Sequence, residues 1–405
     1  MKSKVVVIGH GYTSRLAVVR SIALIGCEIT VIVMAGRKRF CKKLNTKKPL
    51  DCYSKYVSHV HYCYFQDEPG LIQLLLEKCT DAQQKVIIIP DSDFSAAVID
   101  KNQDRLKDKF LFPHIHHKPG AVVEWMDKGK QKCLAIEVGL NAVPSMVIRI
   151  ENRQFDIPGN IKYPCFTKPL ATIVGGKQNM KRCDNKTELK EVLTEASDIV
   201  DIDVLVEDYT PIETEYAVSG FSDGHEIIIP GVIQILDLAN GFHFGVARRG
   251  KIMPIDGFGG LIDKFKQFVL RVGFVGVFDI DFYQSNGEMF FDELNLRIGG
   301  SMYAYTKMGV NLPGMMVKTL TGESIADMQK QITRATTFVN ERMLLDDWYF
   351  GYLSTKEYNR QIKSTEISFV KDKQDKTPQI IYSKEFILYY FKRLLRRAAR
   401  WKLNS

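Results

Sequence analysis

Short apolar runs alternate with amphipathic stretches over the first 113 residues of the chain. Runs of β-branched and other apolar residues predict buried strands at 5–8, 29–33 and 86–89. Apolar residues at helical spacing predict helices over 14–25 and 71–78. Strands that alternate with helices in this way are typical of a doubly wound parallel sheet, so we expect an N-terminal α/β domain over 1–113.

A second pattern predicts a β-hairpin further along the chain. Two β-rich runs of alternating polarity, 278–283 and 289–294, flank an Asn-Gly pair, which is a strong hairpin signal. Glu293 and Asn295 are two positions apart on the second strand and therefore point to the same face. Together with Asp281 on the first strand they offer three oxygen ligands. This set suits Mg²⁺, which binds one or two carboxylates and completes its shell with phosphate oxygens.

Two lysines occur in contexts that suit phosphate binding. Lys128, with Lys130 as a near competitor, lies where a predicted helix begins. Lys168 ends a short strand over 163–168 and is followed by Gly175 and Gly176. A lysine on a strand beside a glycine loop can hold phosphates as a point charge while backbone N–H groups close over them.

The order of these elements resembles the ATP-grasp fold of biotin carboxylase, the carbamoyl-phosphate synthase large subunit and D-alanine:D-alanine ligase. The resemblance covers roughly residues 1–322 and is most specific at Asp127-Lys128, Lys168, Glu207 and 281–297. It implies an α/β fold with a Rossmann-like N-terminal domain and an ATP cleft between two α+β lobes. The implied domains are 1–113, 114–205 for the first lobe, 206–335 for the second, and a C-terminal extension over 336–405.

The resemblance also implies a metal site. In the family, an acidic residue on one strand and a Glu-x-Asn pair on the next hold two Mg²⁺ ions against the ATP phosphates. The corresponding ligands here are Asp281, rather than Asp279, together with Glu293 and Asn295. Two Mg²⁺ ions are expected, with Mn²⁺ as a substitute. Arg297 corresponds to the arginine that stabilises the transferring phosphoryl group.

The remaining ATP contacts implied by the resemblance are spread over both lobes. The phosphates are assigned to Lys128 and Lys168, and the lid that covers them to Gly175 and Gly176. The adenine and ribose contacts are assigned to the hinge between the lobes, at Glu207, Asp208 and Tyr209 for adenine and Glu215 for ribose. Read without the resemblance, Glu207 and Glu215 are ordinary strand carboxylates.

Basic residues between the hinge and the hairpin are candidates to face the γ-phosphate or a substrate carboxylate, which arginine binds bidentately. We favour Arg248 over Arg249 and Lys251, and a solvated loop is an equally weighted alternative.

The N-terminal domain carries two further motifs. Gly9-x-Gly11 follows the first strand but lacks the third glycine of a dinucleotide-binding fingerprint, so we favour close packing of strand against helix. Asp91 and Asp93 follow the strand at 86–89, at the edge where open α/β sheets place ligands. We expect them to line the acceptor side of the cleft.

Composition agrees with an ordinary globular protein. The 405 residues suffice for two or three domains, and 45% hydrophobic and 25% charged residues are typical values. The first residues lead into a strand rather than a signal peptide, and no apolar run reaches the roughly 18 residues that a membrane span needs. We therefore expect a cytoplasmic protein. Eight cysteines without a Cys-x-x-Cys pair predict reduced thiols, with no disulfide and no structural metal.

The net charge of +9 is concentrated at the C-terminus. Residues 384–405 contain seven Lys or Arg and one Glu, which gives +6 for this tail and argues against nucleic-acid binding by the rest of the chain. Apolar residues recur there at helical spacing, at Ile387, Phe391, Leu394, Ala398 and Trp401. Basic residues lie mostly on the other side of the predicted helix. A helix of this kind either lies on an anionic membrane or packs on the protein, and the sequence leaves both open.

Residues 356–378 are polar and predict an irregular linker.

The resemblance implies an ATP-dependent ligase that joins a carboxylate to an amine, or to a thiol, through an acyl phosphate. Small-molecule carboxylates and amines are then the partners, and a homodimer and peripheral membrane contact through Lys384–Ser405 are both left open. A bicarbonate-activating enzyme related to carboxylases or carbamoyl-phosphate synthases is one alternative. A nucleotide-binding sensor or scaffold without turnover is another, disfavoured because the expected metal ligands and lysines are all present.

Overall fold

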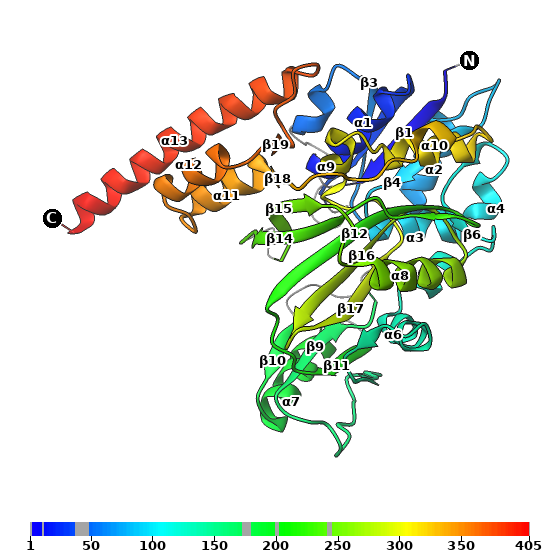
Figure 1. Ribbon diagram of the computed structural model, residues 1–405. Helices are drawn as coiled ribbons and strands as arrows, with labels where there is room; N and C mark the ends of the chain where they lie inside the picture. Colours follow the sequence, from blue (N-terminus) through cyan, green and yellow to red (C-terminus); the bar gives the residue numbers. More distant parts are fainter. Residues whose placement is uncertain are drawn as a thin grey trace.

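Three β-sheets organise the part of the chain that the structure describes (Figure 1). The structure is a computed structural model that describes residues 2–9, 12–36, 48–171, 180–198, 202–240 and 245–404, the side chains of residues 12 and 396–404 excepted. The N-terminal sheet lies at the top of Figure 1, a large mixed sheet crosses the middle, and a four-stranded sheet lies at the bottom. Gly11, Gly175 and Gly176 of the predicted motifs lie outside the described residues.

The N-terminal domain confirms the predicted doubly wound parallel sheet, with strand order β3-β2-β1-β4-β5. Alternate residues of β1 face opposite layers: Val5 and Val7 pack with α1, and Val6 and Ile8 pack with α2. Its elements are β1 (Lys4–Gly9), α1 (Tyr12–Ala23), β2 (Glu28–Met34), the 3-10 helix η1 (Leu50–Tyr53), β3 (Val57–Cys63), α2 (Glu68–Lys78), β4 (Val86–Pro90), α3 (Asp93–Lys101), α4 (Gln103–Leu106) and β5 (Phe110–Leu111).

The first lobe is an antiparallel sheet of order β10-β9-β11-β8, covered by α7. Asn185 caps the start of α7, because its side chain accepts a hydrogen bond from the Glu188 N–H at 3.0 Å. The elements of this region are α5 (Ala121–Glu124), α6 (Lys128–Glu137), β8 (Ser145–Ile148), β9 (Cys165–Pro169), β10 (Lys181–Cys183), α7 (Lys186–Ser197) and β11 (Val204–Asp208).

The large sheet has the order β19-β18-β15-β14-β12-β16-β17-β7, with β13 paired to β12 and β6 paired to β16. Its strands are β6 (His114–Ile115), β7 (Asn141–Ala142), β12 (Thr214–Asp223), β13 (Ile227–Ile228), β14 (Val232–Leu238), β15 (Ala247–Met253), β16 (Phe274–Ser285), β17 (Glu288–Asn295), β18 (Thr336–Val339) and β19 (Ile367–Ser368). The helices of this half are α8 (Gly259–Val272), α9 (Met302–Lys307), α10 (Leu312–Leu320), the 3-10 helix η4 (Ala326–Met328), α11 (Glu341–Phe350), α12 (Thr355–Lys363) and α13 (Thr377–Asn404).

The boundaries that we expected between the lobes differ from the strand pairing. β6 and β7 lie within 114–205 but pair with β16 and β17 of the large sheet, and β11 continues to 208. β18 and β19, which we placed in a separate extension, continue the large sheet beyond β15. Unpaired strand edges accept further strands from anywhere in the chain, so sequence order alone does not fix such boundaries.

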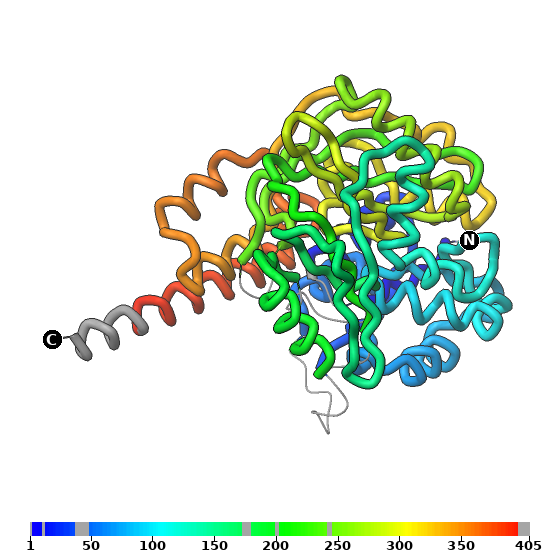
Figure 2. Tube along the Cα trace, turned by 90° about the horizontal axis from the view of Figure 1, so that it is seen from below, coloured from blue at the N-terminus to red at the C-terminus, as the bar shows by residue number. Residues whose placement is uncertain are grey.

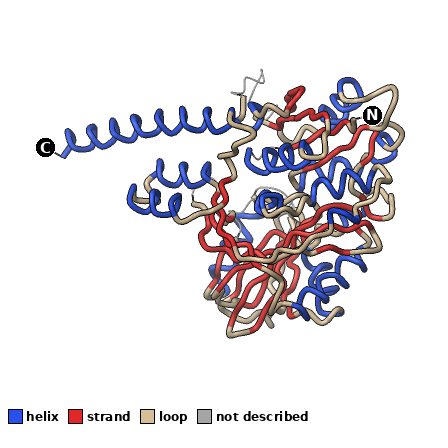
Figure 3. Tube along the Cα trace, turned by 45° about the horizontal axis from the view of Figure 1, so that its top comes forward, coloured by secondary structure: helices blue, strands red, loops and turns tan. Residues whose placement is uncertain are grey.

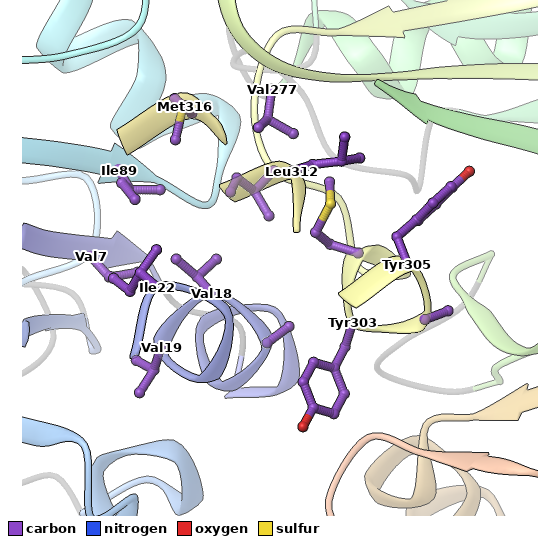
Figure 4. Packing of buried hydrophobic residues seen from close by; sticks show 14 of the residues in the cluster. Val7, Val18, Val19, Ile22, Ile89, Val277, Tyr303, Tyr305, Leu312 and Met316 are labelled. Carbon is purple, nitrogen blue, oxygen red and sulfur yellow. The ribbon is translucent and has the colours of Figure 1, made fainter. Parts of the chain in front are cut away.

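A shared core joins the N-terminal domain to the large sheet. Figure 4 shows Val18 and Ile22 of α1 and Ile89 of β4 facing Leu312 and Met316 of α10, and all are fully or almost fully buried. Burying such side chains contributes about 1.5–3 kcal/mol each, so this contact holds the two parts in one body.

The segment that we predicted as an irregular linker, 356–378, is instead ordered and anchored, and Figure 3 shows its helix and strand. α12 begins where the Ser354 side chain accepts from the Glu357 N–H at 3.1 Å. Arg20 of α1 donates to the Asp375 carboxylate at 2.9 Å and to the Phe369 carbonyl at 2.9 Å. These partners are more than 340 residues away in sequence, so local composition could not reveal them.

None of the described helices is long and apolar enough to cross a membrane.

Replacing Arg20 with Met should therefore loosen the C-terminal region. The substitution leaves the fully buried Asp375 without its charged partner, and breaking a buried ion pair typically costs about 3–5 kcal/mol. Urea unfolding measures the loss. The matched control is Arg105→Met, at an exposed arginine, which should change stability by less than about 0.5 kcal/mol. Equal shifts for the two variants would contradict this anchoring role.

The free energy of unfolding should depend on pH because of His114, which lies on β6 where that strand pairs with β16. Burial, reinforced by His117 and His116, lowers the pKa of His114 to about 4. Its Nδ1 accepts a hydrogen bond from the His117 N–H at 3.4 Å, which requires the neutral ring. Because the folded pKa lies below the unfolded value of about 6.5, stability should fall as pH drops from about 6.5 to 4, by on the order of 1 kcal/mol at pH 5. Unfolding at several pH values should show a flatter profile for His114→Gln, and identical profiles would contradict this assignment.

Candidate active site

The predicted hairpin is present and brings the expected metal ligands to one face. Asn286 and Gly287 have φ of 50° and 77°, as a tight turn between β16 and β17 requires. Asp281 lies directly opposite Glu293, and Asp279 lies opposite Asn295. Cross-strand partners share a face, so all four side chains point the same way.

A β-bulge adds a fifth side chain that the alternation did not predict. Asp281 pairs with Glu293 and Phe282 pairs with Phe291, which leaves Asp292 as the extra residue on β17. Strict alternation would turn Asp292 away from Glu293. The bulge instead keeps it on the site, where its carboxylate contacts the Lys168 ammonium. No sequence signal marked this bulge.

A hydrogen-bonded chain links the hairpin to the N-terminal domain. Asn295 donates its amide to the Asp281 carboxylate at 3.1 Å, and Arg297 donates to the Asn295 amide oxygen at 3.0 Å. Arg297 also donates through Nε to Asp93, at the start of α3, at 3.1 Å, and lies 3.9 Å from Asp279. The structure thus brings Arg297 together with the ligand set and with Asp93 from the expected acceptor edge.

Three lysines of the first lobe face these carboxylates. The Lys128 ammonium lies 2.9 Å from Glu293, and Lys168 lies beside Asp292 and 3.1 Å from Glu207. Lys132, which sequence reasoning missed, lies 2.6 Å from Glu207. Lys132 is four residues after Lys128 and therefore on the same side of α6, which is the signal that could have found it.

Local structure explains why Lys128 rather than Lys130 faces the site. Asp127 caps α6 by accepting from the Lys130 N–H at 2.9 Å, which fixes the first turn. Lys130 points elsewhere, with its ammonium beside Glu124 and 4.3 Å from the Trp125 ring centre. Gln131 donates to the Leu294 carbonyl at 2.9 Å and accepts from the Leu294 N–H at 2.8 Å, which holds α6 against β17.

The two ends of the site carry side chains of opposite charge. Burial, followed by the carboxylates of Glu293 and Asp279, raises the pKa of Asp281 well above its usual range. Burial would also raise the pKa of Asp292, but the lysines outweigh it, Lys168 most strongly, and the pKa is lowered. One end of the site therefore carries crowded carboxylates and the other carries lysine ammonium groups.

The acidic end fits a divalent cation that shares its ligands with a bound phosphate. Among the described residues, no group of three or more His, Cys, Asp or Glu side chains is arranged to hold a metal by itself. Two carboxylates and one amide oxygen are, however, what Mg²⁺ uses when phosphate oxygens and water complete its shell. A cation would also relieve the repulsion that raises the pKa of Asp281.

Glu207 and Asp208 end strand β11, and Tyr209 follows it. The Glu207 carboxylate forms ion pairs with Lys132 and Lys168. The N–H groups of Asp208 and Tyr209 donate to the Pro144 and Pro164 carbonyls at 3.1 Å and 3.0 Å. These two N–H groups are thus engaged in backbone hydrogen bonds, and the adenine contacts of Glu207, Asp208 and Tyr209 remain predictions.

The expected ribose contact lies on the neighbouring strand. Glu215 of β12 is paired with Tyr283 of β16, on the face of the hairpin that carries Asp281. It remains a candidate for the ribose.

Arg248 is not brought to the site. It lies on β15, which is separated from β16 by β14 and β12, and strands lie about 4.8 Å apart. Its guanidinium is buried beside Asp347 of α11 and 3.6 Å from Asp237. Arg249 pairs with Asp237 at 2.5 Å. The interpretation of Arg248 as a phosphate-facing residue is therefore corrected to an anchor for α11.

Asp91 lies close to the site but within the N-terminal domain. It accepts a hydrogen bond from Ser14 at 3.0 Å, and burial is the main reason that its pKa is raised to about 7. Its carboxylate lies directly against Gly9, where a side chain would collide with it. The first glycine of the Gly9-x-Gly11 motif is thus explained by its close approach to Asp91 beyond β4, and not by the packing of strand against helix that we favoured.

No family model matches the chain, but sequence relatives exist. The chain is 24% identical over 220 residues to the carbamoyl phosphate synthase large chain of Halomonas eurihalina, a match that covers 53% of this chain and 20% of that protein. It is 24% identical over 221 residues to the C-terminal section of the carbamoyl phosphate synthase large chain of Aquifex aeolicus, covering 53% and 40%. The match thus spans less than half the length of either relative.

Solved structures resemble the chain over most of its length. L-amino acid ligase from Bacillus licheniformis superposes with a TM-score of 0.59 at 14% identity and covers 83% of this chain and 79% of its own. N5-carboxyaminoimidazole synthetase from Staphylococcus aureus, complexed with ADP, gives a TM-score of 0.61 at 15% identity and covers 87% of both chains. These similarities show that the chain has the ATP-grasp fold.

Proposed function

We propose that this protein is an ATP-dependent ligase that activates a carboxylate as an acyl phosphate and transfers the acyl group to an amine. The observation that carries the proposal is the paired arrangement of Lys128 and Lys168 against Glu293 and Asp292, across the boundary between the lobes. The named relatives and neighbours, which include an amino acid ligase and a synthetase complexed with ADP, support it.

The lysines would bind the phosphates of ATP. Each ammonium group already has a carboxylate partner, and a phosphate oxygen can replace that carboxylate without leaving the lysine unpaired. Lys168 is 9% exposed, so its charge acts in a poorly solvated setting where it attracts a phosphate more strongly than a surface lysine does. Lys132 would hold Glu207 in place and so position the Lys168 ammonium.

The carboxylates would bind the metal ion once the lysines have bound the phosphates. Asp281, Glu293 and Asn295 would hold Mg²⁺, which when bound neutralises the charge that develops on the phosphate oxygens. The Asn295 amide is oriented by Arg297, which donates to one lone pair of its oxygen at 3.0 Å and leaves the second lone pair for a metal.

Arg297 would then act on the reacting groups. Its Nε remains bound to Asp93, while its other nitrogens can donate to the substrate carboxylate and to the phosphoryl group that it receives. The carboxylate oxygen forms a bond to the γ-phosphorus as the bond to the β–γ bridging oxygen breaks, which releases ADP. The amine then attacks the acyl carbon and displaces phosphate. The residues named contribute position and charge rather than a covalent nucleophile.

To test this proposal, ADP release is measured from purified protein incubated with Mg·ATP and each of a panel of carboxylates, with and without amines. We expect ADP release that depends on one class of carboxylate, and hydroxylamine should trap the acyl phosphate as a hydroxamate. ATP binding without ADP release across the whole panel would instead indicate a sensor or scaffold.

Bicarbonate activation is the second candidate, because the sequence relatives are named as carbamoyl phosphate synthase large chains. Bicarbonate would occupy the same position beside Arg297 as an organic carboxylate. ADP release with bicarbonate alone, and none with organic acids, would identify this activity.

A further inference from the structure

Helix α13 docks on the protein through one face and leaves another face uncovered. Phe386 stacks on Trp348 with ring centres 5.6 Å apart, and Tyr389 stacks on Tyr349 at 4.2 Å. The Tyr382 hydroxyl lies 2.9 Å from that of Tyr358. These aromatic residues fix the first half of the helix against α11 and α12.

The uncovered face is apolar and continuous. Its members follow helical spacing and are exposed by 44–70%, and they are Ile387 at 54%, Phe391 at 59%, Leu394 at 44% and Leu395 at 70%. We call these four residues the apolar stripe. Ile380 and Leu388, exposed by 52% and 47%, extend it. A contiguous apolar surface of this kind marks a contact with another molecule or with a membrane.

The helix carries this stripe away from the body of the protein. Figures 1 and 2, seen from directions 90° apart, both show α13 running beyond α11 and α12. Of the two alternatives that the sequence left open, packing on the protein therefore holds only for the aromatic face of the helix. The stripe itself has no cover among the described residues.

Charge indicates what covers the stripe. The last 22 residues hold seven Lys or Arg and one Glu, a formal charge of +6. The one acid, Glu385, is engaged by Arg342 at 2.5 Å. Two copies meeting through this helix would bring two such charges together and repel each other. An anionic surface attracts the same charge, at about 1 kcal/mol per basic residue.

We propose that α13 lies in the plane of an anionic lipid membrane, with the apolar stripe buried at the boundary of the headgroups and the acyl chains. Such helices combine a stripe of Leu and Phe with a Lys- and Arg-rich remainder, as this one does. The aromatic face keeps the helix attached to the protein, so the whole chain is carried to the membrane surface. This inference is independent of the proposed reaction.

Co-sedimentation of the full chain with vesicles tests the proposal. We expect binding to phosphatidylcholine vesicles containing about 30% phosphatidylglycerol, much weaker binding without the anionic lipid, and weakening by added salt. The double variant Phe391→Glu, Leu395→Glu should lower the bound fraction at least tenfold. Lys392→Gln, at an exposed lysine, should lower it by about fivefold through the loss of one charge.

The matched control is Leu24→Glu, which replaces an apolar residue exposed by 60% outside α13 and should leave vesicle binding unchanged. Thermal unfolding checks that each variant is folded. Equal vesicle binding by the wild type and the double variant, or no binding by the wild type, would overturn the proposal. A lipid-free dimer seen by light scattering and abolished by the double variant would also overturn it, because the stripe would then belong to a second copy.

Discussion

Replacing Lys168 with Met should weaken binding of Mg·ATP by about 30- to 1,000-fold, which corresponds to about 2–4 kcal/mol. Methionine keeps most of the side-chain volume but removes the charge that we assign to the phosphates. The substitution also leaves Asp292, whose pKa is lowered by Lys168, as a carboxylate without its main partner. That negative charge would then repel the phosphates. Isothermal titration calorimetry measures the dissociation constant directly.

The control for this variant is Lys190→Met, at an exposed lysine on α7 of the same lobe. It should leave the affinity for Mg·ATP within about twofold. Circular dichroism should show that both variants are folded, because an uncompensated buried carboxylate also reduces stability. Equal affinities for Lys168→Met and Lys190→Met would contradict a phosphate role for Lys168.

Replacing Glu293 with Gln should separate binding from turnover. The amide keeps the shape of the side chain but removes the charge that we assign to the metal, so stabilisation of the transferring phosphoryl group is lost. We expect carboxylate-dependent ADP release to fall by about 10²- to 10³-fold, with a change of less than about fivefold in the dissociation constant for ATP. Coupled ADP detection and calorimetry provide the two measurements.

Glu288→Gln is the matched control, since Glu288 is an exposed glutamate at the start of the same strand. It should retain turnover. Full activity of Glu293→Gln would show that the metal assignment is wrong, and an equal loss in both variants would point to damage of the hairpin rather than of the site.

Sequence patterns predicted the site best where a local rule fixes geometry. The Asn-Gly turn set the register of β16 and β17, and alternation then placed Asp281, Glu293 and Asn295 on one face, as observed. Alternation fails at a bulge, because one extra residue shifts the side chains around it, and Asp292 was missed for this reason. Helical spacing could have identified Lys132, but no motif drew attention to it.

Long-range pairing accounts for the other differences. The anchoring of Arg248 depends on Asp347, 99 residues later, and that of Arg20 on Asp375, 355 residues later. Local composition carries no information about such partners, so Arg248 was assigned to the phosphates and 356–378 to a linker. The α13 helix was predicted from its periodicity, but only the structure distinguishes the face that docks from the face that stays exposed.

We propose that the face shared by the β16–β17 hairpin and the lysines of the first lobe binds Mg·ATP. Calorimetric titration of the wild-type protein with ATP, in Mg²⁺ and again in EDTA, tests it most directly. We expect one saturable site with a dissociation constant below about 1 mM in Mg²⁺ and at least tenfold weaker binding in EDTA. Absence of saturable binding in Mg²⁺, or equal binding with and without the metal, would contradict it.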